Sequence, residues 1–355
     1  MFDEYQAKRI LITGHTGFKG SWLSLWLRQK GAIVAGLALP PEKGIRNLFE
    51  EASVNRVVSS VFADIRDFSD VERSLKDFQP EIIFHLAAQA LVRRSYRDPI
   101  GTFASNVMGT AHVLEAARKT PSVRAIVCVT TDKVYRNRER EQGYREENEL
   151  GGKDPYSASK ACAELVANVY QKTLFPLDGT IALATARGGN VVGGGDWSED
   201  RLIPDMVRSL TASEDIVLRN PRAIRPWQHV LELCAGYLRL GNFLLTDPAK
   251  ATGAWNFGPD RENEVEVEML VKDFIRAWGR PECYIRVEPA RLPEAGILKL
   301  DNSKARRVLG WRPILGYART LRWTAEWYSA FYEKRKNAID LVFEQIQAFE
   351  ELASE

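Results

Sequence analysis

Short apolar runs alternate, through the first half of the chain, with longer segments whose apolar residues recur at helical spacing. The short runs predict strands at Arg9–Thr13, Ile33–Leu37, Val57–Phe62, Ile82–Leu86, Ala125–Val129 and Thr180–Ala186. The longer segments predict helices at Ser21–Arg28, Ser69–Phe78, Asn106–Arg118 and Ser157–Leu174. Strands and helices that alternate with short connections form a parallel sheet with helices on its faces. We therefore predict the α/β class with a doubly wound parallel sheet.

The pattern changes after Arg187, where a glycine-rich loop replaces the regular alternation. A capping box at Ser69 to Glu72 and a glycine stop at Gly279 mark the ends of two helices. We predict a sheet domain over residues 1–187 and a smaller, irregular α/β domain over residues 188–355, with some segments returning to the first. The later helices are expected at Ile203–Ala212, Val230–Leu245, Val265–Trp278, Ser303–Leu309, Tyr317–Tyr332 and Lys336–Glu355.

Composition and charge exclude several classes of function. The chain has 355 residues, 45% of them hydrophobic and 27% charged, and a net charge of +2, which gives no basis for nucleic-acid binding. The four cysteines and four histidines are scattered without metal-ligand spacing, which disfavours a metal site and fits reduced thiols. No signal peptide is visible, and no apolar run approaches the ~20 residues of a membrane span. We expect a soluble cytoplasmic protein with no membrane partner.

A glycine loop joins the first predicted strand to the first predicted helix. Gly14, Gly17 and Gly20 follow the strand end at Thr13 directly. Glycines let the backbone approach a pyrophosphate, whose charge is favoured by the free N–H groups of a helix N-terminus. The order of strand, loop and helix favours a dinucleotide site over a plain glycine turn. The spacing G-x-x-G-x-x-G differs, however, from the general G-x-G-x-x-G fingerprint.

The stretch from Thr130 to Lys160 combines a strand end with a helix start, which is where an open α/β sheet places its chemistry. Tyr156 and Lys160 are four residues apart and lie on one face of a helix. An ammonium beside a phenol favours the phenolate, so we expect Lys160 to lower the pKa of Tyr156 from about 10. The alternative is an ordinary surface pair. The glycine loop and the sequence Thr131-Asp132 favour a general base.

Together these motifs resemble the extended short-chain dehydrogenase/reductase family, over almost the whole chain. Within it the chain is most similar to the sugar-nucleotide 4,6-dehydratases, in the branch that acts on CDP-glucose. Relatives that act on dTDP-glucose or GDP-mannose usually carry Glu where this chain has Lys133. The narrower resemblance rests on the segments Gly14-His-Thr-Gly-Phe-Lys-Gly20-Ser-Trp22, Thr131-Asp-Lys133, Gly193-Gly-Gly-Asp-Trp197 and Arg225-Pro-Trp-Gln-His229.

The resemblance implies a Rossmann-type domain with NAD as its bound cofactor. In an NAD-specific fold an acidic residue usually ends the second strand and binds the ribose. Here Leu37-Ala-Leu-Pro-Pro41 follows that strand, so the choice of NAD over NADP rests on the resemblance. The residues expected to bind the cofactor are Gly14, Thr16, Gly17, Phe18, Gly20, Asp64, Ile65, Leu86, Ala87, Ala88, Asn106, Tyr156 and Lys160.

The resemblance also implies a catalytic set, made of Thr131, Asp132, Lys133, Tyr156 and Lys160. Tyr156 would take the proton from the hydroxyl on sugar carbon 4 while hydride passes to NAD, and Thr131 would hydrogen-bond the same oxygen. Lys160 would lower the Tyr156 pKa and hold the nicotinamide ribose. Asp132 would protonate the hydroxyl that leaves carbon 6, provided that burial keeps it partly protonated. Hydride would then return to carbon 6, giving CDP-4-keto-6-deoxy-D-glucose.

Two questions stay open at the level of sequence. Lys133 could pair with the acidic loop Glu139–Glu149, remove the carbon 5 proton, or hydrogen-bond Asp132 or the substrate. The chain could also be another nucleotide-sugar 4,6-dehydratase, a 4-epimerase, or a non-catalytic NAD(P)-binding sensor. Asp132 and Lys133 argue against an epimerase, which eliminates no water. The complete acid–base set argues against a sensor.

Substrate contacts are expected from the glycine-rich region. A guanidinium fork suits a diphosphate, and we favour Arg201 and Arg225 over Arg187 and Arg222 for that contact. The aromatic candidates have a packing alternative, and His85 is expected to make a backbone contact instead of acting as a base. The residues expected to bind the substrate are Gln89, Asn190, Trp197, Arg201, Arg225, Trp227 and His229.

The partners implied by the resemblance are CDP-glucose and a second copy of the chain. Helices Asn106–Arg118 and Ser157–Leu174 commonly pair with a second copy in that family. We therefore expect a homodimer with a four-helix interface. Deoxysugar products of this kind usually enter bacterial surface polysaccharides such as the lipopolysaccharide O-antigen.

Overall fold

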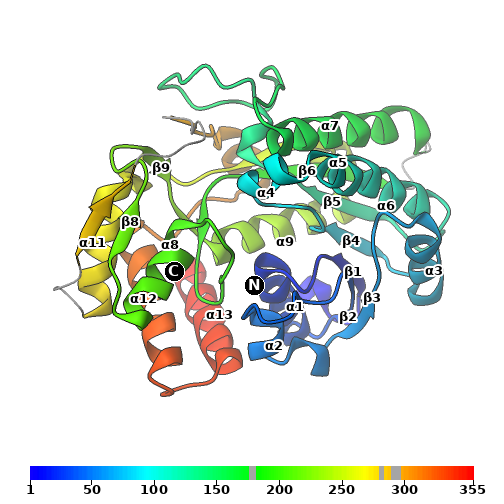
Figure 1. Cartoon of the computed structure of the whole chain (residues 1–355). Coiled ribbons are helices and arrows are strands. Elements are labelled where there is room, and N and C mark those ends of the chain that lie inside the picture. Colours follow the sequence, from blue (N-terminus) through cyan, green and yellow to red (C-terminus); the bar gives the residue numbers. More distant parts are fainter. Residues whose placement is uncertain (176–180, 280–283, 289–296) are drawn as a thin grey trace.

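Seven parallel strands form one central sheet in the order β3-β2-β1-β4-β5-β6-β11 (Figure 1). The computed structural model describes residues 1–175, 181–279, 284–288 and 297–355. The chain starts in the middle of the sheet, runs to one edge and then returns to the other, so the strand order reverses between β1 and β4. The strands are β1 (Arg9–Thr13), β2 (Ile33–Ala38), β3 (Ser59–Phe62), β4 (Ile82–His85), β5 (Ala125–Val129), β6 (Ala182–Gly188) and β11 (Gly253–Phe257).

Helices cover both faces of this sheet. Successive residues of a strand point to opposite faces, so Ile10 and Ile12 of β1 pack into one core and Leu11 into the other. The larger core lies under α1 and α9, and the smaller core lies under α3, α6 and α7. These helices are α1 (Phe18–Gln29), α9 (Val230–Thr246), α3 (Phe68–Phe78), α6 (Gly109–Arg118) and α7 (Pro155–Val169).

The remaining elements lie mostly beyond the carboxyl edge of the sheet, where α8, α11 and α12 gather on the left of Figure 1. The other helices are α2 (Leu48–Glu51), α4 (Val92–Arg97), α5 (Pro99–Phe103), α8 (Leu202–Ala212), α10 (Pro248–Ala251), α11 (Val267–Trp278), α12 (Tyr317–Tyr332) and α13 (Ala338–Ser354). Three short strand pairs are β7 (Val191–Val192) with β10 (Gln228–His229), β8 (Ile216–Leu218) with β13 (Ile285–Val287), and β9 (Ile224–Pro226) with β12 (Glu264–Glu266). Single π-helical turns are η3 (Ala104–Met108), η5 (Tyr170–Leu174) and η7 (Ala305–Leu309).

The six predicted strands are confirmed, although Thr180, the predicted start of β6, lies outside the described residues. The seventh strand, β11, was missed because Gly253 and Asn256 interrupt its apolar pattern. Asn256 is nonetheless buried. Burial is possible because its side chain accepts from the Tyr135 hydroxyl at 2.7 Å and donates to the Tyr144 carbonyl at 2.7 Å. Segments after residue 188 therefore return to the sheet as α9 and β11. The domain division at residue 187 stays a prediction.

The capping box predicted at Ser69 is wrong. Asp67 caps α3 instead, because its carboxylate accepts from the backbone N–H of Ser69 at 2.8 Å and of Asp70 at 3.2 Å. The helix therefore begins at Phe68, and it ends at Phe78 as predicted.

The helix predicted from Asn106 also starts earlier than expected. It begins as α5 at Pro99, continues through the π-helical turn η3 and ends as α6 at Arg118. Asp98 caps it by accepting from the N–H of Gly101 at 2.8 Å, and a proline at the first helical position is an ordinary start signal. The later predicted helices are present with small shifts of their ends, and the predicted stop at Gly279 has the left-handed φ of +83°.

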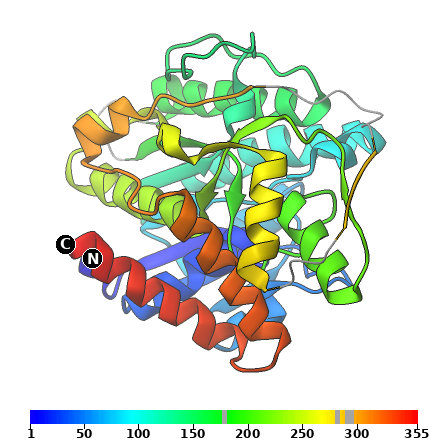
Figure 2. The same cartoon turned by 90° about the vertical axis from the view of Figure 1, so that its left-hand side faces the viewer.

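Helix α13 packs along α1, so the two ends of the chain lie close together (Figure 2). Its Glu350 accepts from the Trp26 indole at 2.9 Å and from Lys30 at 2.6 Å. Among the helices of the described residues, none has the length and apolar character needed to cross a lipid bilayer.

Candidate active site

A cavity of about 800 Å³ opens at the carboxyl edge of the parallel sheet. Residues that follow β4, β5 and β6 form one wall, and residues of α8 and β8 form the other. In doubly wound folds ligands bind at this edge, beside the point where the strand order reverses. The predicted site residues that line it are Leu86, Ala88, Thr131, Asp132, Lys133, Tyr156, Lys160, Asn190, Arg201, Arg225 and Trp227.

The glycine loop between β1 and α1 leaves no room for side chains at two of its glycines. A Cβ on Gly14, whose φ is +77°, would lie 2.7 Å from the backbone nitrogen of Ala87. A Cβ on Gly20 would lie 2.1 Å from the carbonyl oxygen of Gly14. Helix α1 starts at Phe18, after Gly17, with no side-chain cap, which leaves its first N–H groups available to an anion. This geometry fits the pyrophosphate of a dinucleotide.

Three other cofactor candidates lie in this loop or directly after β3. Thr16 donates from its hydroxyl to a backbone carbonyl at 3.0 Å. Asp64 forms an ion pair with Arg66, whose hydrogen bond holds the pKa of that carboxyl below its usual range. Ile65 packs against Gly109, where a Cβ would lie 2.5 Å from the isoleucine side chain. Their contact with a cofactor stays a prediction.

Asn106 connects the loop after β4 to helix α7. It accepts from the backbone N–H of Gln89 at 2.8 Å, and it donates to the Gln89 carbonyl at 3.0 Å and to the Ser159 hydroxyl at 2.8 Å. Ala87, in the same loop, donates its N–H to the hydroxyl of Thr13 at 3.2 Å. The strand end that would lie against a cofactor is therefore fixed by buried and partly buried hydrogen bonds.

Helix α7 brings Tyr156 into the cavity. Asp154 caps the helix by accepting a backbone N–H at 3.0 Å, which places Tyr156 in the first turn. Burial raises the pKa of the Tyr156 phenol to about 12, although a hydrogen bond with Thr131 and the charge of Arg201 both act to lower it. The expectation that Lys160 brings this pKa below 10 is therefore wrong for this arrangement, because burial outweighs the neighbouring charges.

Lys160 links α7 to the end of the neighbouring strand. Its ammonium donates to the carbonyl of Val129, the last residue of β5, at 3.1 Å. Burial lowers the pKa of Lys160 to about 8, against the smaller influence of Cys128 and Glu164. The amine therefore changes its protonation close to neutral pH.

The residues after β5 place a carboxylate beside Tyr156. Asp132 is buried and accepts from the Thr131 hydroxyl at 2.9 Å. The ammonium of Lys133 forms an ion pair with the same carboxylate at 3.8 Å, which is too long for the hydrogen bond that one interpretation expects, so the role of Lys133 stays a prediction. In the acidic loop, Glu149 is paired with Arg136 at 2.8 Å instead.

A buried ion pair that the sequence did not indicate lies directly behind these strand ends. Glu164, one turn beyond Lys160 on α7, accepts from Arg187 through both carboxylate oxygens, at 2.9 and 2.8 Å. It also accepts from the hydroxyls of Thr130 at 2.5 Å and Thr185 at 2.7 Å. Burial acts to raise the pKa of Glu164, but the guanidinium of Arg187 holds it below its usual value. The pair joins β5, β6 and α7, so Arg187 is a structural residue of this region.

Known proteins resemble this chain in sequence and in fold. Residues 11–324 match the family described as GDP-mannose 4,6 dehydratase. The chain belongs to the GDP-mannose 4,6 dehydratase family.

Its relatives include proteins with several activities. The CDP-glucose 4,6-dehydratase of Salmonella typhimurium is 47% identical over 331 residues, which span 92% of each chain. The UDP-glucose 4-epimerase of Mycolicibacterium smegmatis is 30% identical and is matched over 90% of this chain and 98% of its own. Among solved structures, the dTDP-glucose 4,6-dehydratase of Streptomyces venezuelae, with NAD bound, superposes with a TM-score of 0.78 at 28% identity, covering 92% of this chain and 98% of that one.

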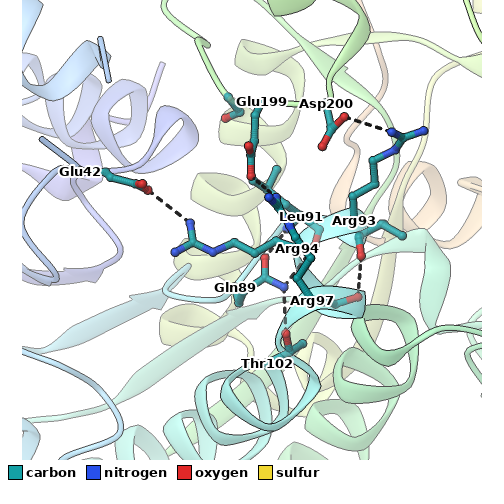
Figure 3. Close-up of polar contacts among 12 residues, drawn as sticks. Glu42, Gln89, Leu91, Arg93, Arg94, Arg97, Thr102, Glu199 and Asp200 are labelled. Atoms are coloured by element: carbon teal, nitrogen blue, oxygen red, sulfur yellow. Dashed lines mark hydrogen bonds and ion pairs between the residues drawn. The ribbon is translucent and has the colours of Figure 1, made fainter. Parts of the chain in front are cut away.

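In this member of the GDP-mannose 4,6 dehydratase family, α4 carries three arginines, and one of them, Arg93, lines the cavity (Figure 3). Each is paired with a carboxylate from another segment: the loop after β2 or the loop before α8. We call these six residues the arginine rim. Its ion pairs are Arg93–Asp200 at 3.4 Å, Arg94–Glu42 at 3.3 Å and Arg97–Glu199 at 2.5 Å.

Four of the seven predicted substrate residues line the cavity. Arg201 faces it from the start of α8 and is paired with Asp196 at 3.1 Å. Arg225 faces it from β9, where it donates to a backbone carbonyl at 3.0 Å. Asn190 and Trp227 complete this set. Their contact with a substrate stays a prediction.

Two aromatic candidates are packing residues in this structure. Trp197 lies in a cluster with Trp327 and donates from its indole to the Tyr332 hydroxyl at 3.0 Å. His229 caps α9 by accepting the N–H of Leu231 at 3.3 Å, and burial lowers its pKa to about 3. The packing alternative therefore describes both of them, and neither lines the described cavity.

Gln89 holds the start of α4 in place. Its amide donates to the Thr102 hydroxyl at 2.9 Å and accepts from the N–H of Leu91 at 2.6 Å (Figure 3). These contacts occupy both the oxygen and the nitrogen of the Gln89 amide. The side chain does not belong to the described lining of the cavity.

The expected backbone contact of His85 is wrong. Its two ring nitrogens hydrogen-bond the hydroxyls of Thr13 at 2.7 Å and Thr110 at 3.0 Å. Burial and the charge of Lys160 lower the pKa of His85 to about 3. The ring is therefore neutral and joins β1, β4 and α6.

Proposed function

We propose that this chain is a nucleotide-sugar 4,6-dehydratase that converts CDP-D-glucose to CDP-4-keto-6-deoxy-D-glucose and water. The observation that carries the proposal is the meeting of Tyr156, Thr131 and Asp132 in one cavity beside a glycine loop. A tyrosine that can take a proton as its phenolate and a buried carboxylic group are what an oxidation followed by an elimination requires. The choice of nucleotide is supported by the 47% identity to the Salmonella typhimurium protein named CDP-glucose 4,6-dehydratase.

The cofactor of the proposed reaction is NAD, held by the glycine loop and by Lys160. When bound, NAD supplies the acceptor for hydride from sugar carbon 4 and returns it later to carbon 6. The tight approach of Gly14 to Ala87 and the uncapped start of α1 support a pyrophosphate at this place. A structural relative contains NAD. Chromatography of the cofactor released on denaturation tests the choice, and NADP would contradict it.

In the proposed first step, Tyr156 removes the proton of the carbon 4 hydroxyl, and Thr131 hydrogen-bonds the same oxygen. Because burial raises the pKa of Tyr156 to about 12, the phenolate has to be favoured by its neighbours. Thr131 and Arg201 act in that direction. The oxidation leaves a ketone at carbon 4, which acidifies the proton on carbon 5.

In the proposed elimination, the carbon 5 proton and the carbon 6 hydroxyl leave together as water. Lys133 faces the cavity. Its ammonium first passes a proton to Asp132, the neutral amine then takes the carbon 5 proton, and Asp132 gives the transferred proton to the leaving oxygen. The 3.8 Å approach of the Lys133 ammonium to the Asp132 carboxylate supports a proton-relay pair. The carbon–oxygen bond at carbon 6 breaks, and carbon 6 later receives the hydride while carbon 5 regains a proton.

Arg225 and Arg201, with Asn190, are proposed to hold the diphosphate of the substrate. All three line the cavity that also holds Tyr156. A guanidinium binds a phosphate through two parallel hydrogen bonds. Trp227, which lines the same wall, is proposed to contact the sugar or the base.

The decisive experiment presents the purified protein with CDP-glucose, dTDP-glucose and GDP-mannose and records the alkaline absorbance of the keto product. Product from CDP-glucose alone is expected. No product from CDP-glucose would contradict the proposal. A product only from another sugar nucleotide would point to a sibling dehydratase, and a bound cofactor without any product would point to a sensor. Conversion of UDP-glucose to its 4-epimer would favour an epimerase, the activity named for the Mycolicibacterium smegmatis relative.

A second copy of the chain is proposed to pack on α7 and on the continuous helix formed by α5, η3 and α6, as predicted for Asn106–Arg118; α5 and α7 lie side by side in Figure 1. Large apolar side chains are exposed on this face, and exposed apolar patches often mark a surface that a partner covers. Sedimentation velocity tests the dimer, and Leu165→Glu should yield monomers. A wild-type protein that is monomeric at micromolar concentration would contradict it. The exposed apolar residues of the face are Ile100, Phe103, Met108, Leu165 and Val169.

A further inference from the structure

A further lysine faces the cavity and has no role in the proposed reaction. Lys19 lies on the first turn of α1 and lines the cavity together with Tyr156, Lys160 and Arg201. Its backbone is held firmly, because a Cβ on the next residue, Gly20, would lie 2.1 Å from a carbonyl oxygen of the glycine loop. Lys19 thus belongs to the glycine loop that is predicted to hold the pyrophosphate, and it shares the cavity with the predicted general base.

The ammonium of Lys19 differs from the other cations of the cavity in its surroundings. Within the described parts of the chain it forms no ion pair, and its Nζ lies 5.9 Å from the ring centroid of Tyr237 on α9. Arg201, by contrast, has the carboxylate of Asp196 at 3.1 Å. Keeping a half-buried cation without a carboxylate in contact costs free energy of folding. This cost favours a functional role for the charge of Lys19.

The charges that surround Lys19 are mostly positive. The pKa of Lys19 is lowered to about 8, mainly by burial and also by the nearby cations Arg201 and Lys160, while Cys234 and Asp132 act to raise it. The cavity floor is therefore electropositive at the place where α1 meets α9 and β5. This field acts on any charge that changes during a reaction in the cavity.

A purely structural role explains Lys19 less well. The aliphatic stem could fill space over Tyr237, but a methionine would fill the same space without a charge. The separation of 5.9 Å is at the outer limit of ~6 Å for a cation–π contact, so that contact contributes little.

We propose that Lys19 raises the reduction potential of the nicotinamide cofactor bound in this cavity and so favours the oxidation of the sugar. The inference rests on the proposed function, in which NAD receives the hydride. Accepting a hydride removes one positive charge from the nicotinamide, while the two electrons and the hydrogen leave sugar carbon 4 and the hydroxyl proton goes to Tyr156. A cation in the cavity that receives the ring would repel the oxidised form and so would stabilise the reduced form.

The test measures the potential itself, without sugar nucleotide and without turnover. Wild-type, Lys19→Met and Lys19→Arg holoenzymes are equilibrated with a redox dye, and the near-ultraviolet absorbance of bound reduced nicotinamide is read. The methionine variant should shift the equilibrium toward the oxidised form by about tenfold, whereas the arginine variant should stay within about threefold of wild type.

Lys30→Met is the matched control, because Lys30 lies at the other end of α1 and pairs with Glu350 at 2.6 Å. It removes the same charge from the same helix but lies far from the cavity, so the potential should not change. Thermal unfolding of each variant separates a loss of stability from a change in potential.

Equal potentials in wild type and Lys19→Met would overturn the inference. If the methionine variant does not retain cofactor, Lys19→Gln is measured in the same way. Loss of cofactor from both neutral variants, with retention by the arginine variant, would also overturn it and assign Lys19 to cofactor retention. Absence of any nicotinamide cofactor from the wild-type protein would contradict the proposed function instead, so the two failures are distinct.

Discussion

Two charged regions of the molecule hold their charges in opposite ways. Behind the strand ends, the side chains of Arg187 and Glu164 are only 4% and 3% exposed and are joined by two hydrogen bonds. On the arginine rim, the side chains of Arg97 and Glu199 are 62% and 49% exposed and share a single contact. Salt and water screen the rim pair, whereas the buried pair is largely shielded from both.

This contrast separates the part of the site that is fixed from the part that can adapt. A buried pair with all its hydrogen bonds satisfied keeps β5, β6 and α7 in one arrangement, so Asp132 and Tyr156 keep their positions. An exposed pair can exchange its carboxylate for another anion at little cost. We therefore expect the chemistry to depend on the buried region and substrate entry to depend on the rim.

Tyr156→Phe should reduce activity more than any other change, and it tests whether the fixed region carries the chemistry. A phenyl ring keeps the packing but cannot take a proton, so product formation should fall by about 10³-fold. The alkaline absorbance of the keto sugar measures it. Tyr284→Phe, at a residue that is 78% exposed, is the control and should have the wild-type rate. A Tyr156→Phe enzyme that keeps a tenth of the activity would exclude Tyr156 as the base.

Glu164→Gln should destabilise the fold far more than any substitution on the rim. It leaves the guanidinium of Arg187 buried without its carboxylate, which typically costs about 3–5 kcal/mol in the free energy of unfolding. Urea denaturation measures the loss. Adding Arg187→Met removes the unpaired charge and should restore part of the stability. A loss below about 1 kcal/mol would mean that the two regions do not differ as described.

Asp132→Asn separates the two halves of the proposed reaction. An amide cannot protonate the leaving oxygen, so elimination should slow by about 10²-fold while the first oxidation persists. Stopped-flow absorbance of reduced nicotinamide reports the oxidation, and quenched samples report the product. An equal loss at both steps would refute the separate role of Asp132.

The pH dependence of the free energy of unfolding should come from buried histidines, such as His85. The pKa of His85 is lowered to about 3, so between that pH and its ordinary value of about 6.5 the folded protein binds fewer protons than the unfolded chain. Stability is therefore full above pH ~6.5 and is lost as the pH falls through this window.

Replacing His85 by Asn should make the acid slope shallower by up to about 1.4 kcal/mol per pH unit. Urea titrations at several pH values measure the slope. Because His15 and His229 titrate in the same sense, the comparison is between variant and wild type. Arg97→Ala, on the rim, should leave the slope unchanged, and an unchanged slope in His85→Asn would contradict the assignment.

Substitutions on the arginine rim should have the smallest effect on stability. Arg97→Ala removes an exposed pair and should change stability by less than about 1 kcal/mol. The Michaelis constant should instead rise at low ionic strength, and the difference should fade as salt is added. A destabilisation as large as that of Glu164→Gln would show that the rim is also a fixed element.

The sequence predicted the reaction centre because its signals are local. An apolar run that ends at Val129 places Thr131 and Asp132 at the sheet edge, and the four-residue spacing of Tyr156 and Lys160 places both on one helix face. Glu164 continues the same spacing, a signal that could have identified it. The fold followed from the alternation of strands and helices for the same reason.

The parts that were missed depend on contacts between distant segments or on burial. Arg97 and Glu199 are 102 residues apart, and no local pattern joins them. The raised pKa of Tyr156 results from burial, which a spacing argument does not measure. His229 looked like a ligand because of its motif, but its ring nitrogen caps α9.

The late position of β11 in the chain bears on how the protein is synthesised. This strand covers the open edge of β6 but is made long after it, once the whole of α8 and α9 has left the ribosome. During that interval β6 exposes unpaired backbone groups that could pair with another nascent chain. A pause in translation between the two strands should therefore increase aggregation, and one placed after β11 should not.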